Sequence, residues 1–507
     1  MKDKCIYSLV LVILVSVLQF FLANSIKFGD GTIFFNSHGI NGTIQLSEDK
    51  THIRIYYNNS NLSNNTFLII IGNGASANIS IGQFCKDANC SIPIMIGGRV
   101  SIEIRSFRHS IYKMNLFLPQ HSVFCEGDIW PNRQCELRNV CYQQMKLSVY
   151  SPYKIDFSNP LLSLSAKQPP TDNVFLRINS SQIQTIKSLP SDTITYMPHS
   201  HLLVNIPNPG MLWHVFYDFL LPLVKTLDLP NKFDHERRLF FMPHSSFMIT
   251  PLLEYIVKNK WKVLNSPMCF SHLSLGVKKV TYLHEYWKEP IHPPHLWRDA
   301  IYDFDYHSIS KLQSLVLKGI GYMEENSSKP LLIVVQRNAK TRVLKNFQDI
   351  VSVLKRVFIG FDILEIDFEK MKLNEQIRLS ARASIIVGAH GSGLAHQIWM
   401  RKGSGTIEIF PYKFTCRDWY EKAAIAGGLK YMSYFPDSTL ESPDSSPEMH
   451  QCWSGKINCL SLLCLDRLLS QNISVDIPRF ESQITSIWTQ WAKRKIINNQ
   501  KIENAIL

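Results

Sequence analysis

The sequence predicts an α/β protein with two doubly wound halves and a cleft between them, preceded by a small β-rich region. From about residue 125, short apolar runs with strand character alternate with amphipathic helical runs, which is typical of parallel sheets covered by helices. A loop at 324–329 separates two such series. The chain has 507 residues, more than one hydrophobic core usually supports, so several domains are expected.

The amino terminus carries a membrane-targeting signal. Lys2 and Lys4 precede an uncharged run from Cys5 to Ala23, which is nearly long enough to cross a bilayer. The small residues that follow offer a cleavage site, so residues 1–25 are either a signal-anchor or a signal peptide, and the length of the run favours an uncleaved type II anchor. The rest of the chain is then expected in the lumen of the Golgi or the endoplasmic reticulum.

Glycosylation sequons and cysteines agree with a lumenal body. Sequons occur at Asn41, Asn58, Asn61, Asn64, Asn78, Asn89, Asn179, Asn326 and Asn472. Ten cysteines follow the amino-terminal run, and the close groups among them are predicted to form disulfides: Cys85/Cys90, Cys135/Cys141, and the trio Cys452, Cys459 and Cys464. A zinc site is the alternative, but the sequence has no CxxC pair and no histidine spacing that completes a four-ligand set.

The charge balance argues for an anionic ligand rather than for nucleic acid. The 54 Lys+Arg exceed the 41 Asp+Glu, which gives a net charge of +13. The basic residues are scattered and form no long block, so nucleic-acid binding is not expected. A phosphorylated substrate such as a nucleotide sugar explains local basicity equally well.

Residues 26–124 differ from the rest of the chain. Short β-rich runs at 52–57, 67–71 and 100–105 alternate with Asn, Ser and Gly turns, and six of the nine sequons fall here. We expect a small glycosylated β-rich domain or stem.

The two α/β halves are expected at 125–325 and 326–480, followed by a carboxy-terminal helix and tail at 481–507. In the first half we predict strands at 202–205, 239–242 and 277–283 and helices at 211–221 and 245–258, with Pro222 ending or kinking the first helix. In the second half we predict strands at 330–335 and 361–366 and helices at 347–357 and 373–383.

A glycine turn in the second half is the strongest site candidate. The segment His390-Gly391-Ser392-Gly393-Leu394 follows an apolar strand run, 384–388, and precedes a helix-like run, 395–400. Glycines let the backbone approach a phosphate, and the start of the following helix favours negative charge. Glu408, in the next predicted strand at 406–410, is placed to accept hydrogen bonds from sugar hydroxyls. A tight structural turn is the alternative, because the glycine spacing fits neither GxGxxG nor the Walker pattern.

Two further groups are candidates. Arg337 and Arg342 follow the predicted strand 330–335, where ligands bind in open α/β sheets, and guanidinium groups match phosphate oxygens. His214 and Asp218 are four residues apart on a predicted helix and share a face, so the carboxylate can orient the imidazole as a general base, or Asp218 can itself serve. The alternatives are a solvated basic loop and a structural ion pair.

These residues carry a resemblance to a known family. The segments NPGMLWHVFYDFLLPL, VVQRNAKTRVLKN, ILEIDFEKMKLNEQIRLSARASIIVGAHGSGLAHQIWM and GTIEIFPY occur in that order, and the stretch from about 125 to 480 resembles glycosyltransferase family 61. It is most similar to the branch of protein O-mannose and EGF-domain O-linked N-acetylglucosaminyltransferases.

The resemblance implies a GT-B fold whose carboxy-terminal half binds the nucleotide sugar, and an inverting transfer that requires no metal or other cofactor. His390, Gly391, Ser392, Gly393 and Leu394 match the family's HGAGL turn, with Ser392 in place of alanine. Arg337 and Arg342 match its paired arginines. Glu408 matches the acid of the following strand, and His214 and Asp218 match the amino-terminal His/Asp helix.

The function expected from the sequence is therefore transfer of N-acetylglucosamine, or of a pentose such as xylose, from a UDP-sugar to a hydroxyl on a protein or glycan. His214 or Asp218 removes the acceptor proton, the arginines and the glycine turn stabilise the departing UDP, and Glu408 holds the ribose. Two alternatives stay open: an inactive glycan-binding or adhesion protein on the same fold, and an enzyme such as a sulfotransferase that moves another group from an anionic nucleotide.

Overall fold

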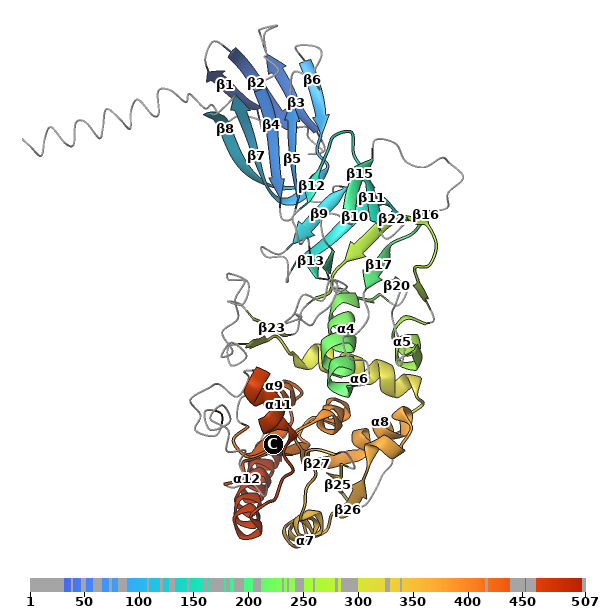
Figure 1. The fold of residues 1–507 in the computed structure, drawn as a ribbon, viewed down its shortest axis with the longest axis vertical. Helices are drawn as coiled ribbons and strands as arrows, with labels where there is room; N and C mark the ends of the chain where they lie inside the picture. The colour runs from blue at the N-terminus through green and yellow to red at the C-terminus, as the bar shows by residue number, and fades with distance from the viewer. Residues whose placement is uncertain are drawn as a thin grey trace, which may run out of the picture.

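The computed structural model describes most residues between 32 and 503. The longest gaps are 58–65, 81–88, 164–176, 187–195, 204–210, 242–249, 284–299, 438–451 and 453–461. The predicted anchor at 1–25 lies outside the described residues. No helix in the described part is both long and apolar enough to cross a membrane. The molecule is elongated, with the β-rich region at one end and a helix-covered parallel sheet at the other (Figure 1).

The β-rich region is a sandwich. One antiparallel sheet has the order β1 (Thr32–Ser37), β2 (Ile40–Leu46), β3 (His52–Tyr57) and β6 (Asn89–Pro93), and the facing strands are β4 (Thr66–Gly72), β5 (Ala75–Ser80), β7 (Ile96–Ser106) and β8 (His109–Leu118). Alternate residues point inward, so Ile53 and Ile55 of β3 pack in one core with Leu68 and Ile70 of β4. The strands predicted at 52–57, 67–71 and 100–105 are confirmed.

The second sheet of the sandwich continues into the first half. Strand β9 (Val123–Glu126) pairs with β7 and with β10 (Gln134–Gln143), and the order then runs through β22 (Met268–Leu275), β17 (Ser200–Leu203), β20 (Arg238–Phe241) and β21 (Trp261–Val263). From β22 to β21 the pairing is parallel. The hydrogen-bonded sheet is therefore continuous across residue 124, the predicted end of the β-rich region.

Disulfides connect neighbouring strands of this sheet. Cys125 of β9 bonds to Cys135 of β10, and Cys141 of β10 bonds to Cys269 of β22. The predicted Cys135/Cys141 pair is wrong, because both residues lie in one strand, where six residues span roughly 20 Å. Cys452 bonds to Cys464, as the trio suggested. Cys85 and Cys459 lie outside the described residues.

The helix predicted at 211–221 continues past Pro222. It begins as α3 (Leu212–Val215), passes through a π-helical turn, η3 (Phe216–Leu220), and continues as α4 (Leu221–Leu227). The N–H of Leu221 donates to the carbonyl of Phe216, five residues back, so the chain is wider there than a regular α-helix. Because the π turn shifts the register ahead of the proline ring, Pro222 neither ends nor breaks the helix.

The second half is built on a parallel sheet of order β26 (Asp362–Ile366), β25 (Leu331–Val335), β27 (Ala383–Ala389), β28 (Gly405–Ile409) and β29 (Lys430–Tyr434). In sequence order this is 2-1-3-4-5, a doubly wound sheet whose order reverses between β25 and β27. The strands predicted at 330–335, 361–366, 384–388 and 406–410 are confirmed within one or two residues.

Helices cover both faces of this sheet. On one face α7 (Phe347–Val357) and α12 (Ile477–Glu503) pack on Leu332 and Val334 of β25. On the other face α8 (Leu373–Arg382), the 3-10 helix η6 (Ser392–Trp399) and α9 (Trp419–Ala426) join α3, α4, α5 (Thr250–Val257) and α6 (Tyr306–Gly319) of the first half in one core that includes Ile333. The two halves thus meet beside the glycine turn.

Candidate functional site

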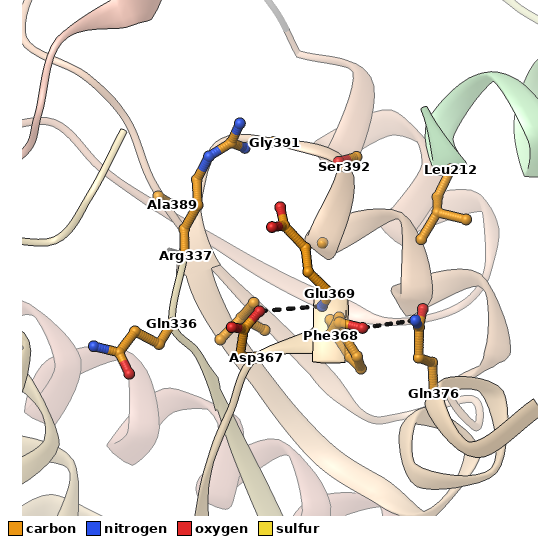
Figure 2. A pocket seen from close by; sticks show the side chains of 12 residues that line it. Leu212, Gln336, Arg337, Asp367, Phe368, Glu369, Gln376, Ala389, Gly391 and Ser392 are labelled. Carbon is orange, nitrogen blue, oxygen red and sulfur yellow. Dashed lines mark hydrogen bonds between the residues drawn. The ribbon is translucent and has the colours of Figure 1, made fainter. Parts of the chain in front are cut away.

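A pocket lies at the carboxyl edge of the second sheet, where the strand order reverses. Its walls come from the ends of three neighbouring parallel strands and the residues that follow them: 335–337 at β25, 367–369 at β26, and Ala389 with 391–393 at β27. Leu212 of α3 and Gln376 of α8 complete the lining (Figure 2). The cavity measures about 150 Å³. This is the place where doubly wound sheets bind ligands, because the loops that leave adjacent strands diverge there.

Arg337 supplies positive charge to this pocket. It follows β25 directly, and Figure 2 shows its guanidinium beside Gly391. Its Nε atom is buried and has no hydrogen-bond partner among the described residues. A buried donor without a partner costs free energy, so a bound anion would be favoured here. The sequence prediction placed Arg337 at this sheet edge, and the structure places it in the pocket.

The glycine turn is shaped by the two arginines. A β-carbon on Gly391 would lie 3.0 Å from Nη1 of Arg337 and 3.2 Å from Nη1 of Arg342. The backbone of Gly391 is extended, so its angles alone do not demand glycine. The close approach of two guanidinium groups favours glycine, because a side chain at this position would make one of them shift by a few tenths of an ångström.

Arg342 is held behind the turn. Its Nη1 donates to the carbonyl of His390 at 3.0 Å, and its backbone N–H donates to the carbonyl of Gln471 at 3.2 Å. Its φ of 60° lies in the left-handed region, which is costly for a residue with a side chain. Arg342 is not among the residues that line the pocket, so in this structure it supports the turn while Arg337 faces the cavity.

His390 and Glu408 form a buried pair under the turn. The two atoms Nδ1 of His390 and Oε1 of Glu408 lie 2.5 Å apart, and the other carboxylate oxygen accepts a hydrogen bond from the hydroxyl of Tyr431. Glu408 is completely buried, which raises its pKa to about 8, more than the hydrogen bond from Tyr431 lowers it. The predicted contact of Glu408 with ribose is not seen, because both oxygens contact protein groups and the residue does not line the pocket.

The sequence reasoning missed a carboxylate in the pocket. Glu369 lies in the short 3-10 turn after β26, and Figure 2 shows its carboxylate directed into the cavity toward the turn at Ser392. Its backbone N–H donates to Oδ1 of Asp367 at 3.1 Å, which fixes the turn. The available signal was its position just after a predicted strand of the parallel sheet, the same rule that selected Arg337.

His214 and Asp218 form the pair that the spacing predicted. Nδ1 of His214 lies 2.5 Å from Oδ2 of Asp218, and the two residues are 4% and 6% exposed. They belong to α3 and the π turn, and α3 packs against η6 next to the glycine turn. Leu212, two residues before His214, lines the pocket, whereas His214 and Asp218 do not.

The structure thus brings Arg337, Gly391, Ser392 and Gly393 together at one cavity. Leu394, Arg342, His390 and Glu408 lie behind the cavity, with Leu394 in the core shared by the two halves. The predicted helix at 395–400 is a 3-10 helix that begins at Ser392, at the pocket itself.

Comparisons with known proteins agree with this site. Residues 212–407 match the family described as Glycosyltransferase 61. That stretch begins at Leu212 and ends next to Glu408, so it contains the helix with His214, both arginines and the glycine turn.

Two curated relatives are distant in sequence. The chain is 25% identical over 348 residues to protein O-linked-mannose beta-1,4-N-acetylglucosaminyltransferase 2 of Homo sapiens, over 64% of this chain and 59% of that protein. It is 23% identical over 404 residues to the Danio rerio protein of the same name, over 76% of this chain and 66% of that protein. The chain therefore spans about 59% of the length of the human relative.

A solved structure, the bacterial iron-containing dodecameric glycosyltransferase TibC from enterotoxigenic E. coli, covers 88% of this chain and 97% of its own, with 8% identity and a TM-score of 0.26. A likeness of that size adds nothing to the assignment, which rests on the matched region and the curated relatives. Residues 212–407 of the chain thus match the glycosyltransferase 61 family, and the chain is distantly related to protein O-linked-mannose beta-1,4-N-acetylglucosaminyltransferase 2.

Proposed function

We propose that this glycosyltransferase transfers a sugar, N-acetylglucosamine or a pentose such as xylose, from a UDP-sugar to a hydroxyl of a protein or glycan, with inversion and without a catalytic metal. The carrying observation is the cavity at the strand-order reversal, where Arg337 lies beside the glycine turn and its buried Nε has no hydrogen-bond partner in the described part of the chain. A GT-B arrangement, with the donor held by the second half and the acceptor by the first, fits a pocket to which α3 contributes Leu212.

In this proposal the diphosphate lies between Arg337 and the turn at Gly391. A guanidinium with unused donors stabilises the negative charge that grows on the leaving UDP, which lowers the barrier to breaking the glycosidic bond of the donor. Arg342 and the His390–Glu408 pair act through the turn, since both contact its first residue. The relatives described above are N-acetylglucosaminyltransferases, which supports this donor for the chain.

In this proposal Glu369 accepts the hydrogen bonds from sugar hydroxyls that the sequence predicted for Glu408. The carboxylate of Glu369 and the diphosphate of the donor are both negative and repel each other in so small a cavity. The carboxylate is therefore expected to face an uncharged part of the donor or acceptor. Hydroxyl groups of a sugar or ribose are suitable donors to it.

The reaction is a single displacement. The acceptor oxygen forms a bond to the anomeric carbon as the bond to UDP breaks, and the acceptor proton passes to the base. Nδ1 of His214 is engaged with Asp218, so in this proposal the proton passes to Nε2 of the imidazole. An acceptor would enter beside Leu212, on the same helix.

The lumenal location stays a proposal. The three disulfides of the described residues, Cys125–Cys135, Cys141–Cys269 and Cys452–Cys464, support an oxidising compartment such as the Golgi or endoplasmic reticulum. A membrane attachment through residues 1–25 would retain the enzyme there.

The deciding experiment titrates the purified chain with UDP-N-acetylglucosamine, UDP-xylose, UDP-arabinose and GDP-mannose. Thermal stabilisation and slow release of UDP are measured in parallel, with and without EDTA. We expect one UDP-sugar to stabilise the protein selectively and to be hydrolysed whether or not EDTA is present. A folded protein that responds to no nucleotide would instead be a glycan-binding protein on a transferase fold.

A further inference from the structure

A second polar cluster lies in the first half, on the large mixed sheet. Glu136 is on β10, His272 is on β22, and His199 directly precedes β17. In the register, Glu136 is opposite Ser274, and Arg138 is opposite His272.

The third strand brings the second imidazole to the same face. Ser200 of β17 is opposite Leu273 of β22, so the preceding residue, His199, comes beside His272. Side chains alternate between the faces of a strand, and the three strands are adjacent in the sheet. Glu136, His199 and His272 therefore project from one face although 136 residues separate the first from the last.

The three side chains converge. The imidazole rings of His199 and His272 are stacked, with centroids 3.7 Å apart and an interplanar angle of 6°. Oε2 of Glu136 lies 2.5 Å from Nε2 of His272 and 3.6 Å from Nε2 of His199. One donor atom from each of the three residues lies within 4.8 Å of the other two. Nε2 of His272 is buried and makes no hydrogen bond of good geometry within the described part of the chain, despite that short contact.

Two imidazole nitrogens and a carboxylate are a ligand set that zinc prefers. With bonds of 2.0–2.2 Å, a tetrahedral ion needs neighbouring donor atoms roughly 3.3–3.5 Å apart. The observed separations of 2.5 and 3.6 Å lie on either side of that value. A small rotation of the Glu136 side chain would bring its oxygen to that distance, and one imidazole would also have to turn out of the stacked arrangement, because a metal bound to Nε2 lies in the plane of the ring.

The local charges also suit a cation. Both oxygens of Glu136 contact the hydroxyl of Ser274, at 2.9 and 2.7 Å, and Oε2 also faces both imidazoles, so the side chain presents a carboxylate to the cluster.

Arginines lie near the cluster. Arg138 is opposite His272 in the register. Nε of Arg237 donates to Oδ2 of Asp234 at 2.8 Å, which offsets part of the Arg237 charge. Its Nη1 donates to Oγ of Ser274 at 2.9 Å, and that hydroxyl contacts both oxygens of Glu136. This is the kind of outer-shell support that orients a metal-binding carboxylate.

We propose that Glu136, His199 and His272 bind a divalent transition-metal ion, Zn²⁺ above all, with a fourth position open to water. The side chains of Glu136, His199 and His272 are 38%, 37% and 28% exposed, so an ion can enter from solvent. The ion links β10, β22 and the start of β17. Because the cluster shares no residue with the lining of the donor pocket, its role is to stabilise the first half rather than to take part in transfer.

The test uses the full chain, stripped with EDTA and dialysed. Zn²⁺ is titrated in competition with a zinc-binding dye, bound zinc is counted by mass spectrometry, and the thermal midpoint is followed. We expect one zinc per chain and a rise of the midpoint on binding. Glu136→Gln and His272→Ala should each weaken zinc binding by about 100-fold or more, and Ser274→Ala by about 10–100-fold.

His307→Ala is the matched control. His307 is also a histidine with its Nε2 2.5 Å from a carboxylate, that of Asp228, but it lies outside the cluster. It should bind zinc as the unaltered chain does, and so should Arg337→Ala, which is expected to lose UDP binding instead. Glu136→Gln keeps the side-chain shape, so its result is interpretable even where His272→Ala fails to fold. Zinc binding of unchanged affinity in Glu136→Gln, or no stoichiometric zinc in the unaltered chain, would overturn the proposal.

Discussion

Nη1 of Arg337 lies so close to Gly391 that a β-carbon on the glycine would be 3.0 Å from it. The position of the guanidinium and the lack of a side chain on the turn are therefore linked: with a β-carbon at residue 391, the arginine would have to shift by a few tenths of an ångström. The backbone at this point is extended, so this contact, and not the backbone angles, favours glycine there.

Gly391→Ala is the first prediction. The added methyl group displaces the guanidinium of Arg337, so we expect affinity for UDP to fall by about tenfold, somewhat less than the loss of one hydrogen bond to a charged group. Isothermal titration calorimetry with UDP measures this affinity. Ser392→Ala, in the same turn, removes an atom instead of adding one and should bind UDP nearly as well as the unaltered chain. Equal affinity in all three proteins would remove the turn from the donor site.

Arg337→Ala should weaken UDP binding more strongly, by roughly 10–100-fold, because it removes the charge that faces the cavity. Lys340→Ala is a matched control, since Lys340 is a cation of the same loop but is exposed and does not line the pocket. Titration of both variants at two salt concentrations separates direct contact from general attraction. A similar loss in the two variants would contradict a specific role for Arg337.

Glu369→Gln should separate binding of UDP from use of the sugar. Removing a negative charge from the pocket relieves repulsion of the diphosphate, so affinity for UDP should rise or stay unchanged. If the carboxylate accepts hydroxyl groups, the rate of UDP-sugar hydrolysis should fall by about tenfold. Parallel measurement of UDP affinity and of sugar release checks this. A hydrolysis rate equal to that of the unaltered chain would show that Glu369 does not contribute to the reaction.

The His214–Asp218 pair is expected to act in chemistry and not in donor binding. Loss of a positioned general base typically costs ~10²–10⁴ in rate, so His214→Ala should lower transfer by that order while UDP binding persists. Asp218→Asn should have a smaller effect if His214 is the base, and a larger one if the carboxylate itself takes the proton. Transfer to an acceptor is the assay, and undiminished activity in both variants would exclude this helix from the reaction.

His396 makes the stability of the protein sensitive to acid. The residue is fully buried between the rings of Phe216 and Phe368, and burial lowers its pKa to about 3 from 6.5. Because the unfolded chain binds the proton more readily, stability is complete above pH 6.5 and is lost as the pH falls toward 3.

The free energy of unfolding falls by at most about 1.4 kcal/mol per pH unit. Between pH 7.5 and 5.0, protonation of His396 should therefore lower it by about 2 kcal/mol. His396→Phe keeps a ring at the site and should lack that part of the pH dependence, as measured by urea unfolding at the two pH values. The exposed His307, changed to Phe, should leave the dependence intact. Parallel curves for the unaltered chain and His396→Phe would show that His396 does not titrate as inferred.

The sequence was sufficient for features that depend on local patterns. Short apolar runs predicted the strands of the parallel sheet in the second half, because strands covered by helices on both faces bury both sets of side chains. The rule that ligands bind after parallel strands placed Arg337 at the sheet edge where the cavity lies, and the four-residue spacing placed His214 against Asp218. The same spacing rules failed for Cys135 and Cys141, since a strand holds them far apart.

Only the tertiary structure decided which residues meet across the chain. The sequence predicted that Glu408 binds the ribose of the donor. In the structure its side chain points inward from β28 and contacts His390 and Tyr431. Side-chain alternation along β28 and the position of the neighbouring strand determine this direction. Glu136, His199 and His272 show no metal-ligand spacing in the sequence, because sheet register brings them together from three separate segments. Local periodicity determined the elements of this protein, and the pairing of distant strands determined its sites.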